Sequence, residues 1–186
     1  MRYLFLVLLL FVTACGKQLE NPLNWPVQEF ATIDQEGKEV NVEQLKGKVW
    51  VADFIFTNCT TVCSPMTAQM AFLQKKLKEE GLDVSLVSFS VDPDRDTPEA
   101  MKAYGENFDA DFSNWHFLTG YSNEEIISFS KESFKSPIIF EPGTDQVGHV
   151  TSFFLVDDKG VVVRKYPGIE PTTLDQIVKD AKLIVD

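Results

Sequence analysis

Two continuous apolar runs, separated by one helical stretch, constrain the fold of this chain more than any other feature. Residues 49–56 (VWVADFIF) and 84–91 (VSLVSFSV) are rich in β-branched and aromatic residues, which is typical of strands buried on both faces of a sheet. The stretch 63–80 between them carries apolar residues at steps of four, three and four from Met66 to Leu77. A strand, a crossing helix and a second strand indicate a parallel sheet.

The rest of the chain continues this alternation and ends in an antiparallel part. The segment 135–148 contains two prolines and two glycines and is expected to be a long loop or small insertion. We therefore expect an α/β domain with a central mixed sheet flanked by helices. The further expected elements are a helix opening at Thr97-Pro98, a strand at 115–119, a helix with a capping box at Ser122 and Glu125, a hairpin of strands at 151–156 and 161–166, and a closing helix at 172–184.

Length and charge narrow the functional classes. With 186 residues the chain has room for one domain with a substantial core. Lys and Arg number 17 against 28 Asp and Glu, which gives a formal net charge of -11. Such a chain is a poor nucleic-acid binder and is repelled by anionic lipid head groups. We expect no nucleic-acid partner and no membrane binding by electrostatics alone.

The first 14 residues have the features of a secretory signal. Arg2 is their only charged residue, and the apolar run at 3–12 is about half of the ~20 residues that span a bilayer as a helix. The sequence VTAC at 12–15, followed by Gly16, resembles the lipobox of bacterial lipoproteins. This resemblance implies that Cys15 is lipidated and becomes the mature N-terminus; the alternative is a plain signal peptide with an incidental Cys15.

Three domain segments follow from this interpretation. Residues 1–14 are expected to be a lipoprotein signal peptide, 15–28 a lipidated N-terminus and polar tether, and 29–186 the folded domain. The domain is then expected on the outer face of the bacterial cytoplasmic membrane. Thiols in that oxidising space are either paired or chemically used.

The remaining two cysteines lie four residues apart in CTTVC. Within a helix that spacing strains a disulfide, so the pair fits better with Cys59 in a loop and Cys63 in the first helical turn. The dipole and free N–H groups at a helix start lower thiol pKa values. The site can therefore cycle between dithiol and disulfide or hold a soft metal ion. The alternative, an inert structural disulfide, closes a very short loop and gains little stability.

A histidine is a further candidate ligand for a metal at this site. His149 stands where the segment 135–148 enters the strand expected at 151–156, whereas His116 lies within a short strand and is interpreted as structural or surface. Two thiolates and an imidazole suit both zinc and copper, and the general affinity order favours copper. Thiolates favour Cu(I), and an added imidazole also accommodates Cu(II).

The aspartates after the second apolar run offer one more candidate. Asp92 follows the strand directly, and ligands collect at the carboxyl ends of parallel strands. If the two strands are neighbours, Asp92 lies near Cys59; the alternative is a turn aspartate in Asp-Pro. Asp94 and Asp96 are expected to be solvated loop residues, with Arg95 as their ion-pair partner.

Four motifs in this order resemble the SCO/SenC family of copper-binding proteins: FIFTNCTTVC, SVDPDRDTP, LTG, and His149 before SFFLV. The resemblance implies a thioredoxin-like fold and one copper ion, Cu(I) or Cu(II), bound by Cys59, Cys63 and His149, with Asp92 as a further contributor. It also implies a role in maturing the dinuclear copper centre of cytochrome c oxidase subunit II, by delivering copper, by reducing that centre's cysteines, or both. Members often carry proline after each cysteine, where this chain has Thr60 and Ser64.

Such a metallochaperone is not an enzyme in the turnover sense, and it requires a copper donor and a thiol reductant that the sequence does not identify. One alternative is a thiol-disulfide oxidoreductase of the cell envelope, with Cys59 attacking and Cys63 resolving and no obligatory metal. A second alternative is a peroxiredoxin-type peroxidase, which needs an activating arginine; Arg95 is the candidate. We further expect the segment 135–148 to be mobile without metal and ordered once His149 is a ligand.

Overall fold

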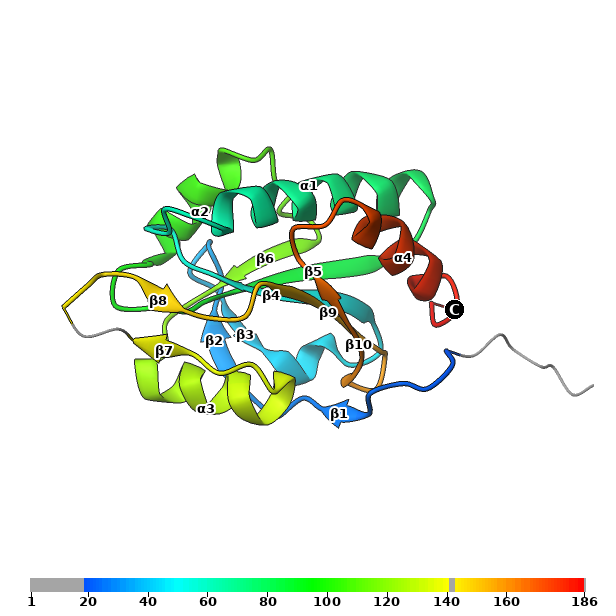
Figure 1. The fold of residues 1–186 in the computed structure, drawn as a ribbon, viewed down its shortest axis with the longest axis horizontal. Coiled ribbons are helices and arrows are strands. Elements are labelled where there is room, and N and C mark those ends of the chain that lie inside the picture. The colour runs from blue at the N-terminus through cyan, green and yellow to red at the C-terminus, as the bar shows by residue number, and fades with distance from the viewer. Residues whose placement is uncertain (1–18, 141–142, 186) are drawn as a thin grey trace, which may run out of the picture.

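A six-stranded mixed sheet lies at the centre of the computed structural model, which describes residues 19–140 and 143–185 (Figure 1). The expected α/β class with a mixed sheet is confirmed. β4, β5 and β6 run parallel, whereas β9, β10 and β1 add an antiparallel part. In spatial order the strands are β1 (Trp25–Pro26), β10 (Val161–Pro167), β9 (Ser152–Val156), β4 (Val49–Ile55), β5 (Val84–Ser90) and β6 (Trp115–Leu118).

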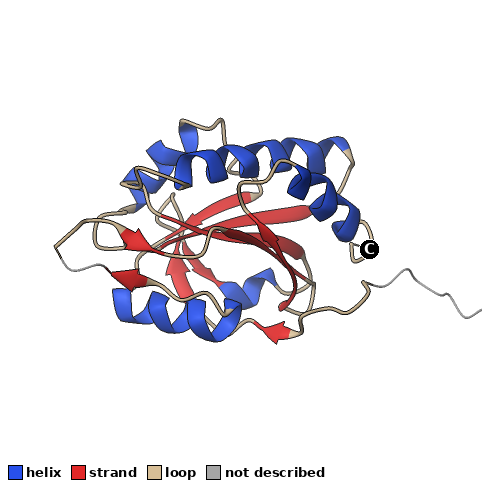
Figure 2. Ribbon diagram, in the orientation of Figure 1, coloured by secondary structure: helices blue, strands red, loops and turns tan. Residues whose placement is uncertain are grey.

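Helices cover both faces of this sheet. Figure 2 shows α1 and α4 on one side and α3 on the other. The ring of Phe134 on α3 lies 6.2 Å from that of Trp50 and 5.2 Å from that of Phe54. Side chains alternate along a strand, so Asp53 of β4 faces the opposite side, under α1. The helices are α1 (Cys63–Glu79), α2 (Pro98–Glu106), α3 (Asn123–Phe134), α4 (Thr172–Ala181) and a short 3-10 helix (Val42–Leu45).

The helix ends follow their sequence signals, with one exception. The capping box of Ser122 and Glu125 is present, and Thr97 caps α2. The expectation that the last helix reaches residue 184 is wrong: α4 ends at Ala181, and tight turns with bonds such as that from the Ile184 N–H to the Ala181 carbonyl follow it.

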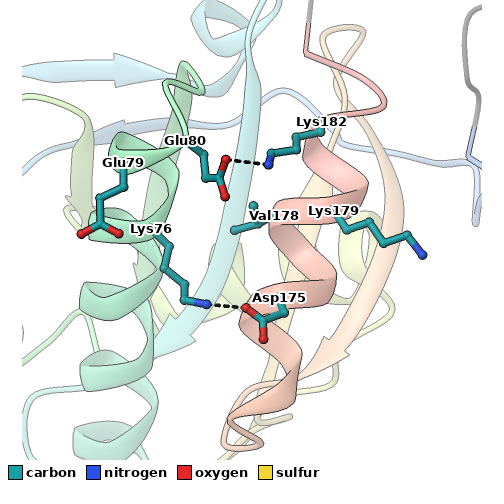
Figure 3. A pocket seen from close by; sticks show the side chains of 7 residues that line it. All are labelled: Lys76, Glu79, Glu80, Asp175, Val178, Lys179 and Lys182. Carbon is teal, nitrogen blue, oxygen red and sulfur yellow. Dashed lines mark hydrogen bonds and ion pairs between the residues drawn. The ribbon is translucent and has the colours of Figure 1, made fainter.

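Two ion pairs join the C-terminal half of α1 to α4. Lys182 Nζ lies 2.6 Å from Glu80 Oε2, and Lys76 pairs with Asp175 (Figure 3). All four side chains are largely exposed, so these pairs contribute little to stability. The two pairs line a groove of about 360 Å³, together with Glu79, Val178 and Lys179.

Several short strands were not expected from the sequence. The hairpin of β2 (Ala31–Ile33) and β3 (Glu39–Asn41) precedes the first long strand. Within 135–148, expected as a long loop or small insertion, β7 (Ile139–Phe140) pairs with β8 (Val147–Gly148), and these two strands form a small ribbon. Strands of two or three residues are too short to show a period of two.

The N-terminal part of the chain is described from residue 19, so the expected signal peptide, Cys15 and the first tether residues lie outside the described residues. Part of the range expected as a tether forms β1, and the Leu23 N–H donates to the Val163 carbonyl of β10. None of the helices in the described ranges is long and apolar enough to cross a membrane.

The parallel pairing of β4 and β5 decides where the candidate residues lie. Ile55 and Ser90 are register partners at the carboxyl ends of the two strands. The chain that follows β4 carries Cys59, and the chain that follows β5 carries Asp92, so both leave the sheet at the same edge.

Candidate metal and dithiol site

The two cysteines lie at the junction between β4 and α1, as the sequence predicted. A turn, closed by the Cys59 N–H donating to the Phe56 carbonyl, carries Cys59, and Cys63 is the first residue of α1. Val62 precedes the helix and provides no capping side chain; instead the Cys63 N–H donates to Cys59 Sγ at 3.4 Å. The sulfur therefore satisfies one of the free N–H groups at the helix start. Both thiols are free, with Cys59 half-buried and Cys63 buried.

His149 comes to this junction from a distant part of the chain. It follows β8, and its Nε2 lies 3.7 Å from Cys63 Sγ, although 86 residues separate the two. Its Nδ1 lies 3.4 Å from the Val150 carbonyl, and its ring meets that of Phe56 edge-on at 5.9 Å. With the proton on Nδ1, the Nε2 lone pair points at the sulfur. His116 lies on β6 and is half-buried.

The two thiols differ in acidity because their surroundings differ. Partial burial raises the pKa of Cys59, but hydrogen bonds from the Cys63 thiol and from backbone N–H groups outweigh it, so the pKa lies below its usual value. Burial raises the pKa of the Cys63 thiol far above its usual value, and the hydrogen bond it gives to Cys59 adds to this shift. Cys59 is therefore the more acidic thiol of the pair, and Cys63 is the thiol that keeps its proton more firmly.

The imidazole is held in its neutral form. Burial lowers the pKa of His149, and the hydrogen bond to the Val150 carbonyl only partly opposes this. A neutral imidazole with one nitrogen bonded to a carbonyl and the other facing a sulfur is arranged as metal-ligating histidines are.

Asp92 lies at the same sheet edge but has a different partner. Its side chain is buried, and Oδ2 accepts a hydrogen bond from Arg95 Nη1 at 2.7 Å. The expectation that Arg95 pairs with Asp94 or Asp96 is therefore wrong. Asp92, Arg95 and Phe140 line a cavity of about 210 Å³ between this turn and the ribbon of β7 and β8. The structure thus places Asp92 at the same sheet edge as the cysteines, in an ion pair with Arg95. That Asp92 contributes to metal binding remains a prediction.

Polar contacts tie the ribbon to the cysteine loop. Asn58 Nδ2 donates to Asp145 Oδ2 at 2.7 Å, and Gln146 Nε2 donates to the Asn58 carbonyl at 3.2 Å. The Thr60 hydroxyl reaches Gln146 Oε1 at 3.5 Å. These contacts, which we call the ribbon clamp, hold the segment before His149 against the segment around Cys59.

Sequence reasoning missed the role of Asp96. It was expected to be solvated, but its side chain is 0% exposed and accepts hydrogen bonds from Thr57 and Ser90. Burial raises the pKa of Asp96, and these hydrogen bonds oppose the shift. One sequence signal pointed to a fixed position for Asp96: it directly precedes Thr97, the N-cap of α2.

The donor chemistry of Cys59, Cys63 and His149 fits a soft or borderline metal ion. In residues 19–140 and 143–185, however, no three or more Cys, His, Asp or Glu side chains form a group already arranged to hold a metal. Cys63 and His149 face each other, whereas Cys59 Sγ is engaged by the Cys63 N–H and lies 3.8 Å from the Thr61 hydroxyl. A metal ion at this site therefore requires a local adjustment of the cysteine loop.

The fold and this junction define a thioredoxin-like protein with a dithiol beside an imidazole. The family model described as SCO1/SenC matches residues 21–185. The chain belongs to the SCO1/SenC family, as the sequence motifs predicted.

The similar proteins include relatives from Bacillus. The SCO1 protein homolog of Bacillus subtilis is 50% identical over 177 residues, which cover 95% of this chain and 92% of the relative. A crystal structure of a SCO1/SenC family lipoprotein from Bacillus anthracis is 54% identical, covers 89% of this chain and 98% of its own, and has a TM-score of 0.86.

Two further solved structures carry functional descriptions. BsSco, described as a cytochrome c oxidase assembly protein with a disulfide switch, is 50% identical with a TM-score of 0.83, over 90% of this chain and 97% of its own. ScoI of Arabidopsis thaliana, solved with copper bound, is 30% identical with a TM-score of 0.72, over 83% of this chain and 97% of its own.

Proposed function

We propose that this chain binds one copper ion through Cys59, Cys63 and His149 and helps to assemble the dinuclear copper centre of cytochrome c oxidase subunit II. The observation that carries the proposal is the approach of His149 Nε2 to Cys63 Sγ at 3.7 Å, because it joins an imidazole to the dithiol across 86 residues. Family membership and the copper-bound relative support it. Copper would be cargo here, delivered to the partner.

The test is a copper titration of the reduced protein, wild type beside His149→Ala. We expect about one copper per chain, strong thiolate-to-copper absorption, and a Cu(II) affinity that falls in His149→Ala by more than the roughly 10- to 100-fold typical of losing a group that only orients a ligand. His116→Ala is the matched control, since that imidazole lies on β6. A reduced protein with no preference for copper over zinc would remove the proposal.

A second candidate function is reduction of the partner's cysteines without an obligatory metal. The different acidity of the two thiols favours it, because a half-buried thiolate at Cys59 can attack and a buried Cys63 can then resolve the mixed disulfide. The relative with a disulfide switch is consistent with it. Oxidase assembly retained in a His149→Ala strain but lost in Cys59→Ala would select this function over copper delivery.

The peroxidase alternative gains no support from the site. It requires an arginine to activate the thiolate, and the guanidinium of Arg95 is bound to Asp92 instead. A peroxide-consumption assay with a thiol reductant should therefore show no turnover by the purified protein.

We also propose that the protein is anchored through lipidated Cys15 on the outer face of the bacterial cytoplasmic membrane, with residues 1–14 removed and 15–28 as the tether. The Bacillus anthracis relative, described as a lipoprotein, supports this. The partners proposed for this chain at the membrane are cytochrome c oxidase subunit II, a copper donor and a thiol reductant. Mass spectrometry of the membrane-extracted protein tests the anchor: a Cys15→Ala variant should lose the diacyl mass and leave the membrane fraction.

A further inference from the structure

Asp96 lies at the centre of a buried hydrogen-bond network that the copper and dithiol chemistry does not itself use. Its carboxylate accepts from the Thr57 N–H at 3.2 Å, from the Thr57 hydroxyl at 2.6 Å and from the Ser90 hydroxyl at 2.5 Å. Its backbone carbonyl accepts from the Thr119 hydroxyl at 2.6 Å. The network joins the ends of β4, β5 and β6 through this single residue.

Asp96 is a buried carboxylate that is surrounded by hydrogen-bond donors but, in the part of the chain that the structure describes, has no cationic partner. Asp96 is 0% exposed, and within the described ranges no Lys, Arg or His pairs with it, since Arg95 binds Asp92. A buried carboxylate without a cation is costly unless donors surround it. The Thr57 N–H and the two hydroxyls supply three donors, and the Ser90 oxygen in turn accepts from the Asp92 N–H.

The network reaches the cysteines through a short path along the chain. Thr57 stands two residues before Cys59, inside the turn that the Cys59 N–H closes onto the Phe56 carbonyl. Cys59 Sγ then receives the Cys63 N–H at 3.4 Å. Fixing Thr57 by both its N–H and its hydroxyl therefore fixes the start of the segment that sets the position of Cys59 relative to Cys63.

We propose that Asp96 is a positioning residue for the dithiol, which through Thr57 holds the cysteine loop where a Cys59–Cys63 disulfide forms. Disulfide geometry is narrow, with Cβ atoms about 3.5–4.5 Å apart, so a loop that wanders forms the bond less readily. The oxidation is a two-electron exchange: oxidised glutathione takes two electrons and two protons from the two thiols and leaves as two molecules of reduced glutathione. This inference deepens the proposed function, since it concerns the same dithiol.

The test measures the equilibrium constant for this exchange in the full-length mature protein. Free thiols are alkylated, and mass spectrometry then gives the fractions of dithiol and disulfide. Thr57→Val keeps the side-chain volume and removes the hydroxyl, and we expect it to lower the constant roughly tenfold, as should Asp96→Ala, which removes the acceptor. The double variant should show no further loss, because both changes break one link. Thr57→Ser restores the hydroxyl and should behave as wild type.

Ser90→Ala is the matched control for a merely structural role. It removes one hydrogen bond to Asp96 but leaves Thr57 bound, so it should lower the melting temperature without moving the equilibrium constant. An unchanged constant in Thr57→Val, or an equal shift in Ser90→Ala, would overturn the inference. Neither result bears on copper titration of the wild type, so the proposed function can fail or stand separately.

Discussion

At the scale of single residues, Asp53 is a charged-type side chain whose burial is costly. It lies in the middle of β4, is 0% exposed, and neither carboxylate oxygen has a hydrogen-bond partner. Burial raises its pKa to about 7, and the neighbouring Ser88 on β5 offsets only part of this. Every other buried Asp named above has donors around it, so Asp53 is the exception in the core.

Asp53 should make stability fall as pH rises from about 4 to 7. The unfolded chain gives up this proton near pH 4 and the native state near pH 7, so the native state holds more protons between these values. Asp53→Asn should be more stable than wild type at pH 8, by on the order of 4 kcal/mol, and similar to it at pH 4. Urea unfolding at both pH values measures this. Asp83→Asn, an exposed charge, is the control, and a pH profile parallel to wild type in Asp53→Asn would contradict it.

The two thiols should react at different rates. Cys59 is half-buried with a lowered pKa, whereas Cys63 is buried with a raised pKa. Because the thiolate is the reactive form, iodoacetamide at pH 7 should alkylate Cys59 at least about tenfold faster than Cys63. Peptide mass spectrometry of the reduced protein gives both rates. Equal rates in the wild type, or fast labelling of Cys63 in Cys59→Ser, would be incompatible with this assignment.

At the scale of elements, the segment of β7 and β8 was expected as a long loop or small insertion, without its two strands. Its two strands of two residues each carry no periodic signal, and their pairing depends on Ile139 meeting Gly148 across the ribbon. The long strands and the four α-helices of the described residues were predictable. Each carries an apolar pattern over several residues, and some of the helices also begin at a recognisable cap. The ribbon clamp was not predictable, since Asn58 and Gln146 are ordinary polar residues until the fold brings them together.

Breaking the ribbon clamp should loosen the segment that carries His149. Asn58→Ala combined with Gln146→Ala removes exposed hydrogen bonds of about 1 kcal/mol each. Hydrogen exchange at Val147 and Gly148 should then be roughly tenfold faster, and copper should restore protection once His149 is a ligand.

The control for this experiment is Asn24→Ala, whose side chain bonds only to the nearby Pro22 carbonyl. Exchange that is equally slow in the double variant, or identical with and without copper, would count against the clamp and against the expected ordering of this segment.

At the scale of the whole molecule, the N-terminal segment and the dithiol lie at different ends of the sheet. Trp25 of β1 pairs with Val162, which pairs with Val156, which in turn pairs with Trp50 near the start of β4. Cys59 follows the carboxyl end of β4. Figure 1 accordingly shows the described N-terminal segment at the opposite end from the ribbon. A tether attached at this end, as we propose, would present the site away from its point of attachment.

Arg164 binds the first described residues of the chain to the sheet, in addition to the pairing of β1. Arg164 Nη1 donates to the Asn21 carbonyl at 2.9 Å, Nη2 donates to the Glu20 carbonyl, and Nε lies 3.5 Å from Asp180. Arg164→Gln should therefore free the segment, so that chymotrypsin cleaves near Leu23 at least about fivefold faster with little change in the melting temperature. Lys159→Gln in the hairpin turn is the control. Unchanged cleavage in Arg164→Gln would show that β1 pairing alone holds the segment.

The sequence by itself determined the long strands of the sheet, its helices and the place of Cys59 and Cys63 at a strand-to-helix junction. Apolar runs bury strands wherever they occur, and a cysteine pair at a strand-to-helix junction meets the helix start by chain connectivity alone. Only the tertiary structure decided that His149 faces Cys63, that Arg95 binds Asp92, and that Asp96 is buried under Thr57. These are contacts between residues far apart in the chain or between polar neighbours with several partners within reach, and the packing of the sheet edge selects among them.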